Sequence, residues 1–270
     1  MSANQPRKPA GTPVGGQWVS MVHDETDINL GQRTRNRQPK LSVKKDGTRM
    51  WRLGKQLHRD DGPAVEYPDG GEGWYQHGKL HRDDGPAVVW ADGTSEWYQH
   101  DQLHRDDGPA IEYPDGTKGW YQHGQRHRLD GPAIEHANGG REWWVYGQLH
   151  RDNGPAMDVY WGKSWYQHGK LHRDDGPAIE YANGDREWYQ HGSLHRDGGP
   201  AVEHPDGGKW WYQHGQLHRD GGPAVERSNG DREWYQHGEW HRLDGPAVEH
   251  QDGAEEWWID GKRVDPPVEH

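Results

Sequence analysis

The segment WYQHGKLHRDDGPA, which runs from Trp74 to Ala87, recurs along most of this 270-residue chain at a nearly constant interval. A His-Arg pair marks each copy, and its histidines are His58, His81, His104, His127, His150, His172, His195, His218 and His241. The interval is 23 residues, except for 22 between His150 and His172. A fixed period of this length predicts a stack of small structural units, each contacting mainly its neighbours.

The composition limits what such units can bury. Only 29% of the residues are apolar, Phe is absent, and the chain contains 17 Trp and 12 Tyr. A thick apolar core is therefore not expected, and each unit should bury a thin aromatic layer against the next one. The sequence predicts an elongated rather than a spherical body.

Tryptophan defines three regions. Residues 1–40 are rich in Pro, Gly, Asn and Gln and predict a flexible, partly basic leader. Residues 41–264 contain nine repeats and a partial tenth, marked by Trp51, Trp74, Trp97, Trp120, Trp143, Trp165, Trp188, Trp211, Trp234 and Trp257. Residues 265–270 begin with Asp-Pro-Pro and predict a terminal cap, because proline cannot donate to a β-ladder.

Two turn signals occur in each unit. The first is His77-Gly78 and its equivalents, and glycine in second place suits a two-residue type I′ hairpin turn. The second is Asp69-Gly70 and its equivalents, often preceded by proline. Each unit should therefore be an antiparallel β-hairpin, joined to the next by a second tight reversal.

A two-residue turn predicts the cross-strand partners within a unit. The expected pairs are Gln76 with Lys79, Tyr75 with Leu80, Trp74 with His81 and Gly73 with Arg82. Alternation then places Trp and His on one face, and Tyr, Leu and Arg on the other, together with the residue before Trp. A three-residue turn with a bulge is the alternative, and it would shift the register by one.

A row of acidic residues lies on the short strand after the Gly-Pro-Ala segment and has about as many members as the arginine row. Its members are Glu66, Glu112, Glu135, Asp158, Glu180, Glu203, Glu226 and Glu249. Cross-strand ion pairs between the rows are the simplest prediction, each contributing about 0.2–1 kcal/mol when exposed.

The pattern Trp-Tyr-x-x-Gly-x-x-His-Arg-x-x-Gly, followed by a short strand and Asp-Gly, resembles the MORN repeat and its bacterial variant. The resemblance covers about residues 41–264. It implies an all-β fold, an elongated, twisted single-layer array of antiparallel hairpins. It also implies scaffolding, protein-protein contact and sometimes membrane-associated roles, and some bacterial variants are similar to proteins labelled as antitoxin components. The alternative architecture is closure into a β-propeller with two units per blade, which ten Trp positions permit.

Composition also restricts partners and location. With no cysteine, disulfides and thiolate sites are excluded, and without an apolar span or secretion signal we expect a cytoplasmic protein. A formal charge of −12 argues against nucleic-acid binding. Weak binding through the basic lead-in is the exception, and its cations are Arg33, Arg35, Arg37, Lys40, Lys44, Lys45 and Arg49.

Neither metal binding nor catalysis is predicted. His77 and His81 have a spacing seen in metal sites, but they straddle a hairpin turn, which favours a structural role packed on Trp. The Asp60-Asp61-Gly62 loop has too few oxygen ligands for a calcium loop. Residues repeated in every unit meet nearly the same environment, so no distinct acid, base and nucleophile stand out. We expect no cofactor and no enzyme activity.

A specific site must therefore use positions that break the pattern. The most divergent column follows the short strand and comprises Tyr67, Trp90, Tyr113, His136, Val159, Tyr181, His204, Arg227 and His250. With the extra aromatic residues, the candidate binding residues are Trp90, His136, Tyr160, Trp161, His204, Trp210, Arg227, Trp240 and His250. The first functional hypothesis is a non-enzymatic scaffold that contacts a protein partner, in a bacterial or phage setting, with an antitoxin- or immunity-like role. The alternative is a module that binds carbohydrate or choline-type ligands through an aromatic stripe.

Overall fold

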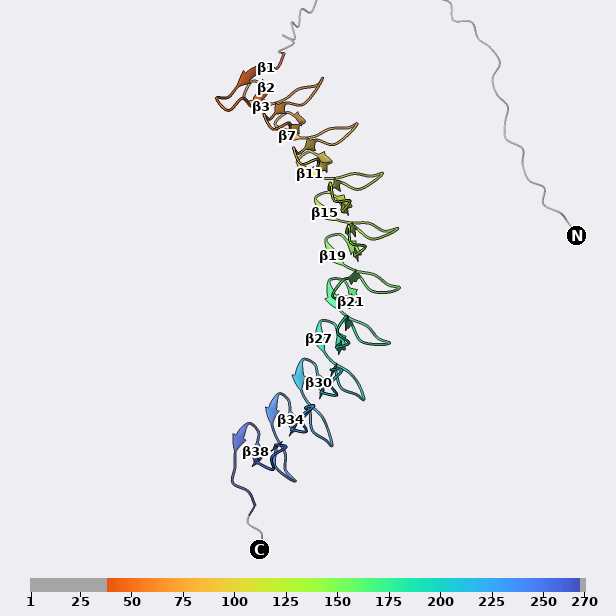
Figure 1. The fold of residues 1–270 in the computed structure, drawn as a ribbon, viewed down its shortest axis with the longest axis vertical. Helices are drawn as coiled ribbons and strands as arrows, with labels where there is room; N and C mark the ends of the chain where they lie inside the picture. Colours follow the sequence, from red (N-terminus) through yellow and green to blue (C-terminus); the bar gives the residue numbers. More distant parts are fainter. Residues whose placement is uncertain (1–37, 268–270) are drawn as a thin grey trace, which may run out of the picture. The chain divides into compact units, whose positions relative to one another are not determined.

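The computed structural model describes residues 38–267, and these form an all-β array without helices. Successive repeats follow one another in a single curved row (Figure 1). Twenty-one strands join in one antiparallel sheet, and nine two-stranded hairpins lie beside it. The predicted all-β array of repeated hairpins is confirmed. The leader prediction falls on residues that lie outside the described range, apart from residues 38–40, and residues 268–270 of the predicted cap lie outside it as well.

The long sheet is built from two short strands in each repeat. Its strands are β1 (Lys40–Val43), β2 (Arg49–Leu53), β3 (Gln56–Leu57), β4 (Val65–Glu66), β5 (Glu72–Gly73), β8 (Val88–Val89), β9 (Ser95–Glu96), β12 (Ile111–Glu112), β13 (Lys118–Gly119), β16 (Ile134–Glu135), β17 (Arg141–Glu142), β20 (Met157–Val159), β21 (Gly162–Ser164), β24 (Ile179–Tyr181), β25 (Arg186–Glu187), β28 (Val202–Glu203), β29 (Lys209–Trp210), β32 (Val225–Glu226), β33 (Arg232–Glu233), β36 (Val248–Glu249) and β37 (Glu255–Glu256). The ladder runs from β1 through β2 to β4 and onward in chain order to β37, with β3 paired to the far end of β2.

The hairpins form a second row. They are β6 (Tyr75–Gln76) with β7 (Lys79–Leu80), β10 (Tyr98–Gln99) with β11 (Gln102–Leu103), β14 (Tyr121–Gln122) with β15 (Gln125–Arg126), β18 (Trp144–Val145) with β19 (Gln148–Leu149), β22 (Tyr166–Gln167) with β23 (Lys170–Leu171), β26 (Tyr189–Gln190) with β27 (Ser193–Leu194), β30 (Tyr212–Gln213) with β31 (Gln216–Leu217), β34 (Tyr235–Gln236) with β35 (Glu239–Trp240), and β38 (Trp258–Ile259) with β39 (Lys262–Arg263). Each hairpin tip also donates to the preceding hairpin, as Gly78 N does to Leu57 O at 2.8 Å.

The two-residue register is confirmed. Tyr75 pairs with Leu80 and Gln76 with Lys79, so His77-Gly78 forms the turn. Both turn residues have positive φ, 51° and 85°, as a type I′ turn requires. Histidine therefore occupies a left-handed position in most repeats, where asparagine or glycine is more usual.

The predicted pairing of Gly73 with Arg82 is wrong. Gly73 belongs to the long sheet and pairs with Val65 and Val88, whereas the hairpin ends at the bond from His81 N to Trp74 O. Trp74 N donates instead to Ala87 O at 2.7 Å. The chain thus leaves one ladder and enters the other at each tryptophan, so alternation cannot be extended through it.

A column of alanines forms the innermost layer. These residues have no exposed surface, and they are Ala64, Ala87, Ala110, Ala133, Ala156, Ala178, Ala201, Ala224 and Ala247. The carbonyl oxygen of each alanine accepts a hydrogen bond from the backbone N–H of the tryptophan in the same repeat, at 2.7–2.8 Å. Small side chains let the loop and the long sheet approach closely, which accounts for a thin core in a chain so poor in aliphatic residues.

Each arginine of the row stacks on the tryptophan ring of its own repeat. The prediction that arginine lies on the face of Tyr and Leu is therefore wrong. The guanidinium of Arg82 stacks 4.2 Å from the Trp74 ring centroid, and the same contact recurs at 3.7–4.2 Å in all nine repeats that have both residues. Arginine therefore shares the face of Trp and not that of Tyr and Leu. Such cation-π contacts contribute about 0.5–2 kcal/mol each, depending on exposure.

The predicted ion pairs between arginine and the acidic row form, but by a different route. Arg59 Nη1 lies 3.1 Å from Glu66 Oε1, within one repeat and across its loop. Equivalent pairs at 2.7–3.3 Å join six further repeats. The same guanidinium donates to Asp61 and to Pro63 O, so each arginine closes its own loop.

The sheet is open. β1 and β37 occupy the two ends of the ladder and do not pair with each other, so the β-propeller alternative is wrong for residues 38–267. Within the same residues, no helix has the length and apolarity that crossing a membrane requires.

Candidate functional site

The divergent column lies at the Asp-Gly turns that join the paired strands of the long sheet. Each member opens a turn, as Tyr67 does by accepting from Gly70 N and donating from its own N–H to Gly71 O. The residue just before each tryptophan comes six positions after the column residue in most repeats. It lies near the tyrosine that follows the tryptophan, as the hydrogen bond from Tyr189 Oη to Glu187 Oε2 at 2.9 Å shows. This surface, made of the divergent column and the residue before each tryptophan, is called the turn face below.

In several repeats a glutamate holds the divergent residue in place. His136 Nε2 lies 2.7 Å from Glu142 Oε1, and the other oxygen of Glu142 accepts from Trp144 Nε1 at 2.8 Å. Arg227 Nε and Nη2 donate to Glu233 Oε1 at 2.9 and 2.6 Å. Both predicted binding residues, His136 and Arg227, are therefore engaged within the protein.

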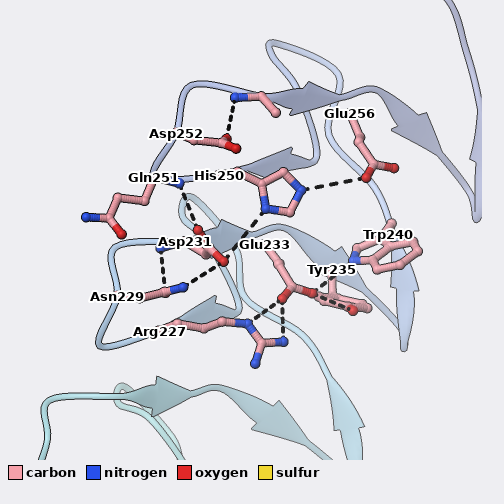
Figure 2. A network of polar contacts seen from close by, with 11 residues as sticks. Arg227, Asn229, Asp231, Glu233, Tyr235, Trp240, His250, Gln251, Asp252 and Glu256 are labelled. Atoms are coloured by element: carbon pink, nitrogen blue, oxygen red, sulfur yellow. Dashed lines mark hydrogen bonds and ion pairs between the residues drawn. The ribbon is translucent and has the colours of Figure 1, made fainter.

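Glu233 is the centre of the largest of these networks (Figure 2). Only 7% of its surface is exposed, and Oε2 accepts from Tyr235 Oη at 2.9 Å and Trp240 Nε1 at 3.2 Å. The Trp240 ring packs 5.0 Å from Trp258 and 5.7 Å from Tyr235. The predicted residue Trp240 thus lies in an aromatic cluster that no other described repeat has, because leucine or arginine occupies its position elsewhere.

Two predicted histidines connect neighbouring repeats. His204 Nδ1 lies 2.7 Å from Asp185 Oδ1 of the preceding repeat, and its ring meets Trp210 edge-on at 4.5 Å. His250 lies 3.7 Å from both Asp231 and Glu256 (Figure 2). Their polar contacts tie adjacent Asp-Gly turns together, so these side chains stabilise the array.

Other turn-face side chains project into solvent, and so does Tyr160, which follows the column residue Val159. Tyr67, Trp90 and Tyr113 are 43%, 50% and 45% exposed, and Tyr160 is 84% exposed. Within the described residues no hydrogen bond or ion pair involves these four side chains. Glycine precedes tryptophan after two of them, at Gly73 and Gly119, so Tyr67 and Tyr113 have no glutamate to bind.

Tyr160 and Trp161 form a turn of their own. Val159 pairs with Gly162, so the two aromatic residues make a two-residue connection between β20 and β21, and this shorter turn accounts for the single 22-residue interval. Trp161 is half-buried with its ring 6.0 Å from Tyr181, whereas Tyr160 points outward. Of the predicted binding residues, Trp90 and Tyr160 are therefore the most accessible. The predicted site omitted Tyr67 and Tyr113, whose exposure is close to that of Trp90 and which the glycines six residues later could have indicated.

Repeated polar grooves lie between consecutive arginine loops. Grooves of about 580 and 620 Å³ lie beside Trp120 and Trp74, with arginine, aspartate, glutamine and histidine on their walls. No group of three or more His, Asp or Glu side chains within residues 38–267 is arranged to hold a metal ion. Because the lining repeats from groove to groove, these grooves offer no single distinct site.

His127 differs from the other recurrent histidines in lacking a carboxylate beside it. Leu129 stands where most repeats have aspartate, and burial lowers the pKa of His127. Since the unfolded chain then binds more protons, the stability from this neutral ring is complete above its ordinary pKa and is lost as the pH falls below it. We expect Leu129→Asp to raise the pKa of His127, because a carboxylate favours the imidazolium. NMR titration checks this, with Leu129→Asn as the uncharged control, and an unchanged pKa in the Asp variant would contradict it.

No protein-family model matches the chain, and no curated protein is significantly similar to it. The residues themselves, through their repetition and the resulting hairpin array, therefore carry the functional argument.

Proposed function

We propose that this protein is a non-enzymatic scaffold, built from a variant of the MORN-type hairpin repeat, that binds a protein partner along its turn face. The observation that carries the proposal is the row of unengaged aromatic side chains at Tyr67, Trp90 and Tyr113, in three consecutive repeats. Exposed tyrosine and tryptophan bury much area at little entropic cost, and these residue types dominate the energetics of protein interfaces.

The arrangement of the framework supports the same proposal. Recurrent histidines, arginines and aspartates hydrogen-bond or ion-pair with one another, so they maintain the array. The variable residues lie at the turns, where sequence changes leave the ladder unaltered. A cytoplasmic location and an antitoxin- or immunity-like role stay predictions.

The test compares two sets of alanine variants of the full chain. In one, Tyr67, Trp90 and Tyr113 are replaced, and in the other the control residues Leu129 and Leu243, which are 78% and 76% exposed in the arginine loops. A partner recovered by affinity purification with the unmodified chain should bind the aromatic variant about tenfold more weakly or worse, and the control with unchanged affinity.

The same proteins are also applied to cell-wall polysaccharide and to immobilised choline. Retention there by the unmodified chain and the control, but not by the aromatic variant, would contradict the protein-binding scaffold and support the ligand-binding alternative. If the unmodified chain and both variants bound the partner equally well, the turn face would be excluded as the binding surface.

A further inference from the structure

The recurrent histidines form a continuous contact between repeats. In all nine, Nδ1 accepts the backbone N–H of the first turn residue in the next hairpin, at 3.1–3.4 Å. We name this column the histidine clamp, and its members are His58, His81, His104, His127, His150, His172, His195, His218 and His241. Most are buried, with 6–8% of their surface exposed.

The geometry assigns the proton on most of these rings. A backbone N–H can only donate, so in the eight rings from His58 to His218 Nδ1 must be the unprotonated nitrogen and Nε2 carries the hydrogen. At His241 a carboxylate oxygen also lies beside Nδ1, so this assignment does not extend to it. In seven repeats Nε2 lies 3.1–3.5 Å from the carboxylate of the aspartate two residues later, and at His81 and His104 the two groups form a hydrogen bond. The aspartate therefore keeps the ring in the tautomer that the clamp needs.

A second proton can then bind only at Nδ1, where it meets a donor. His218 illustrates the consequence. Its Nδ1 accepts from His237 N at 3.2 Å, Asp220 lies 3.5 Å from Nε2, and the tilted His237 ring lies with its centroid 4.7 Å from that of His218. Protonation replaces the hydrogen bond by two opposed N–H groups, and if His237 is also protonated the two neighbouring rings repel each other.

The other charged groups around His218 do not relieve this. Arg196 and Arg219 share its groove, and both are cations that stack on their own tryptophans. Asp220 is 83% exposed and lies beside Nε2, so it attracts the imidazolium without restoring the contact at Nδ1.

We propose that the histidine clamp makes the stacking of repeats acid-sensitive, so that protonation at Nδ1 releases each repeat from the next and loosens the array. Because each repeat contacts only its neighbours, loss of this bond in successive repeats weakens the whole row.

At His241 the turn residue of the next hairpin is an aspartate, which can accept a hydrogen bond from a protonated Nδ1. This difference suggests a variant that tests the proposal. The aspartate is Asp260, which donates its N–H to His241 Nδ1 and also places Oδ1 2.8 Å from that nitrogen. A protonated His241 therefore finds a carboxylate at Nδ1. His237→Asp transfers this arrangement to the His218 contact, and His237→Asn is the matched uncharged control, because both residues tolerate a positive φ.

The experiment measures hydrogen exchange of the full chain around His237, corrected for the intrinsic rate, at about pH 7.5 and about pH 5.5. In the unmodified protein and in His237→Asn, protection should fall roughly fivefold to tenfold at the lower pH, the loss expected for one hydrogen bond. In His237→Asp it should be retained. Equal losses in the two variants, or unchanged protection in the unmodified protein, would overturn the proposal.

A second measurement does not depend on any variant. Nitrogen NMR of the unmodified chain at about pH 7.5 should show neutral rings protonated at Nε2 for the eight clamp histidines from His58 to His218. Rings protonated at Nδ1 under those conditions would also overturn the proposal.

Discussion

Replacing Gly162 with alanine is expected to lower the free energy of unfolding by about 2–5 kcal/mol, from backbone strain and steric overlap together. Gly162 has a φ of 149°, which L-residues rarely adopt. A β-carbon there would overlap the carbonyl oxygen of Glu180 and approach the α-carbon of Tyr181, and both are backbone atoms of the adjacent strand β24. Neither can move without breaking the ladder.

The matched control is Gly116→Ala. Gly116 also has a positive φ, 91°, but a β-carbon there would meet no atom within 4 Å. Its cost should be about 1 kcal/mol, from conformation alone. Urea unfolding followed by tryptophan fluorescence measures both variants. Similar losses for the two glycines would contradict the close approach of β21 to β24.

This tight contact shows where prediction from the sequence stops. The repeat period predicts that one unit is a residue shorter than the others. It does not predict that Tyr160 and Trp161 form the whole turn, or that Gly162 then lies directly against Tyr181. Those features depend on how two neighbouring repeats approach each other, which a period does not encode.

The turn dipeptides predict the hairpins correctly. The His77-Gly78 dipeptide predicts a primed turn, and turn length then sets the pairing of Tyr75 with Leu80. The same reasoning failed beyond Trp74, because alternation assumes one continuous strand and the tryptophan N–H bonds to Ala87 instead. Alternation of side chains along a strand cannot predict a backbone hydrogen bond to a residue outside that strand's ladder.

Contacts between repeats explain the mixed outcome for the candidate site. The divergent column is visible in the sequence, but its division into held and exposed members is not. Arg227 is held by Glu233 six positions later, whereas Trp90 stays exposed although Glu96 has the same spacing. His204 is held by Asp185 of the preceding repeat. For the clamp histidines the sequence likewise predicts only a structural role, because the N–H group that each Nδ1 accepts from belongs to the turn of the next repeat.

Glu233→Ala is expected to destabilise the C-terminal repeats by about 2–4 kcal/mol, because it removes the acceptor of four hydrogen bonds from a buried network. The donors are Arg227, Tyr235 and Trp240 (Figure 2). Burial raises the pKa of Glu233, but hydrogen bonds from these three residues outweigh it and hold the pKa below its usual value.

The pH dependence follows from that direction. A carboxyl whose pKa is lower in the folded protein stabilises the fold above its unfolded pKa, and this contribution is lost as the pH falls through the folded value. The stability difference between the unmodified chain and Glu233→Ala should therefore be largest near neutral pH and shrink in acid. Urea unfolding at several pH values measures it.

Glu187→Ala is the matched control for this prediction. Glu187 occupies the equivalent position two repeats earlier, is only half-buried, and accepts from Tyr189 Oη at 2.9 Å. No arginine or tryptophan side chain donates to it within the described residues, so its loss should cost about 1 kcal/mol. If the two alanine variants were equally stable, the arginine and tryptophan bonds to Glu233 would contribute nothing, and the tyrosine bond common to both sites would account for the whole effect.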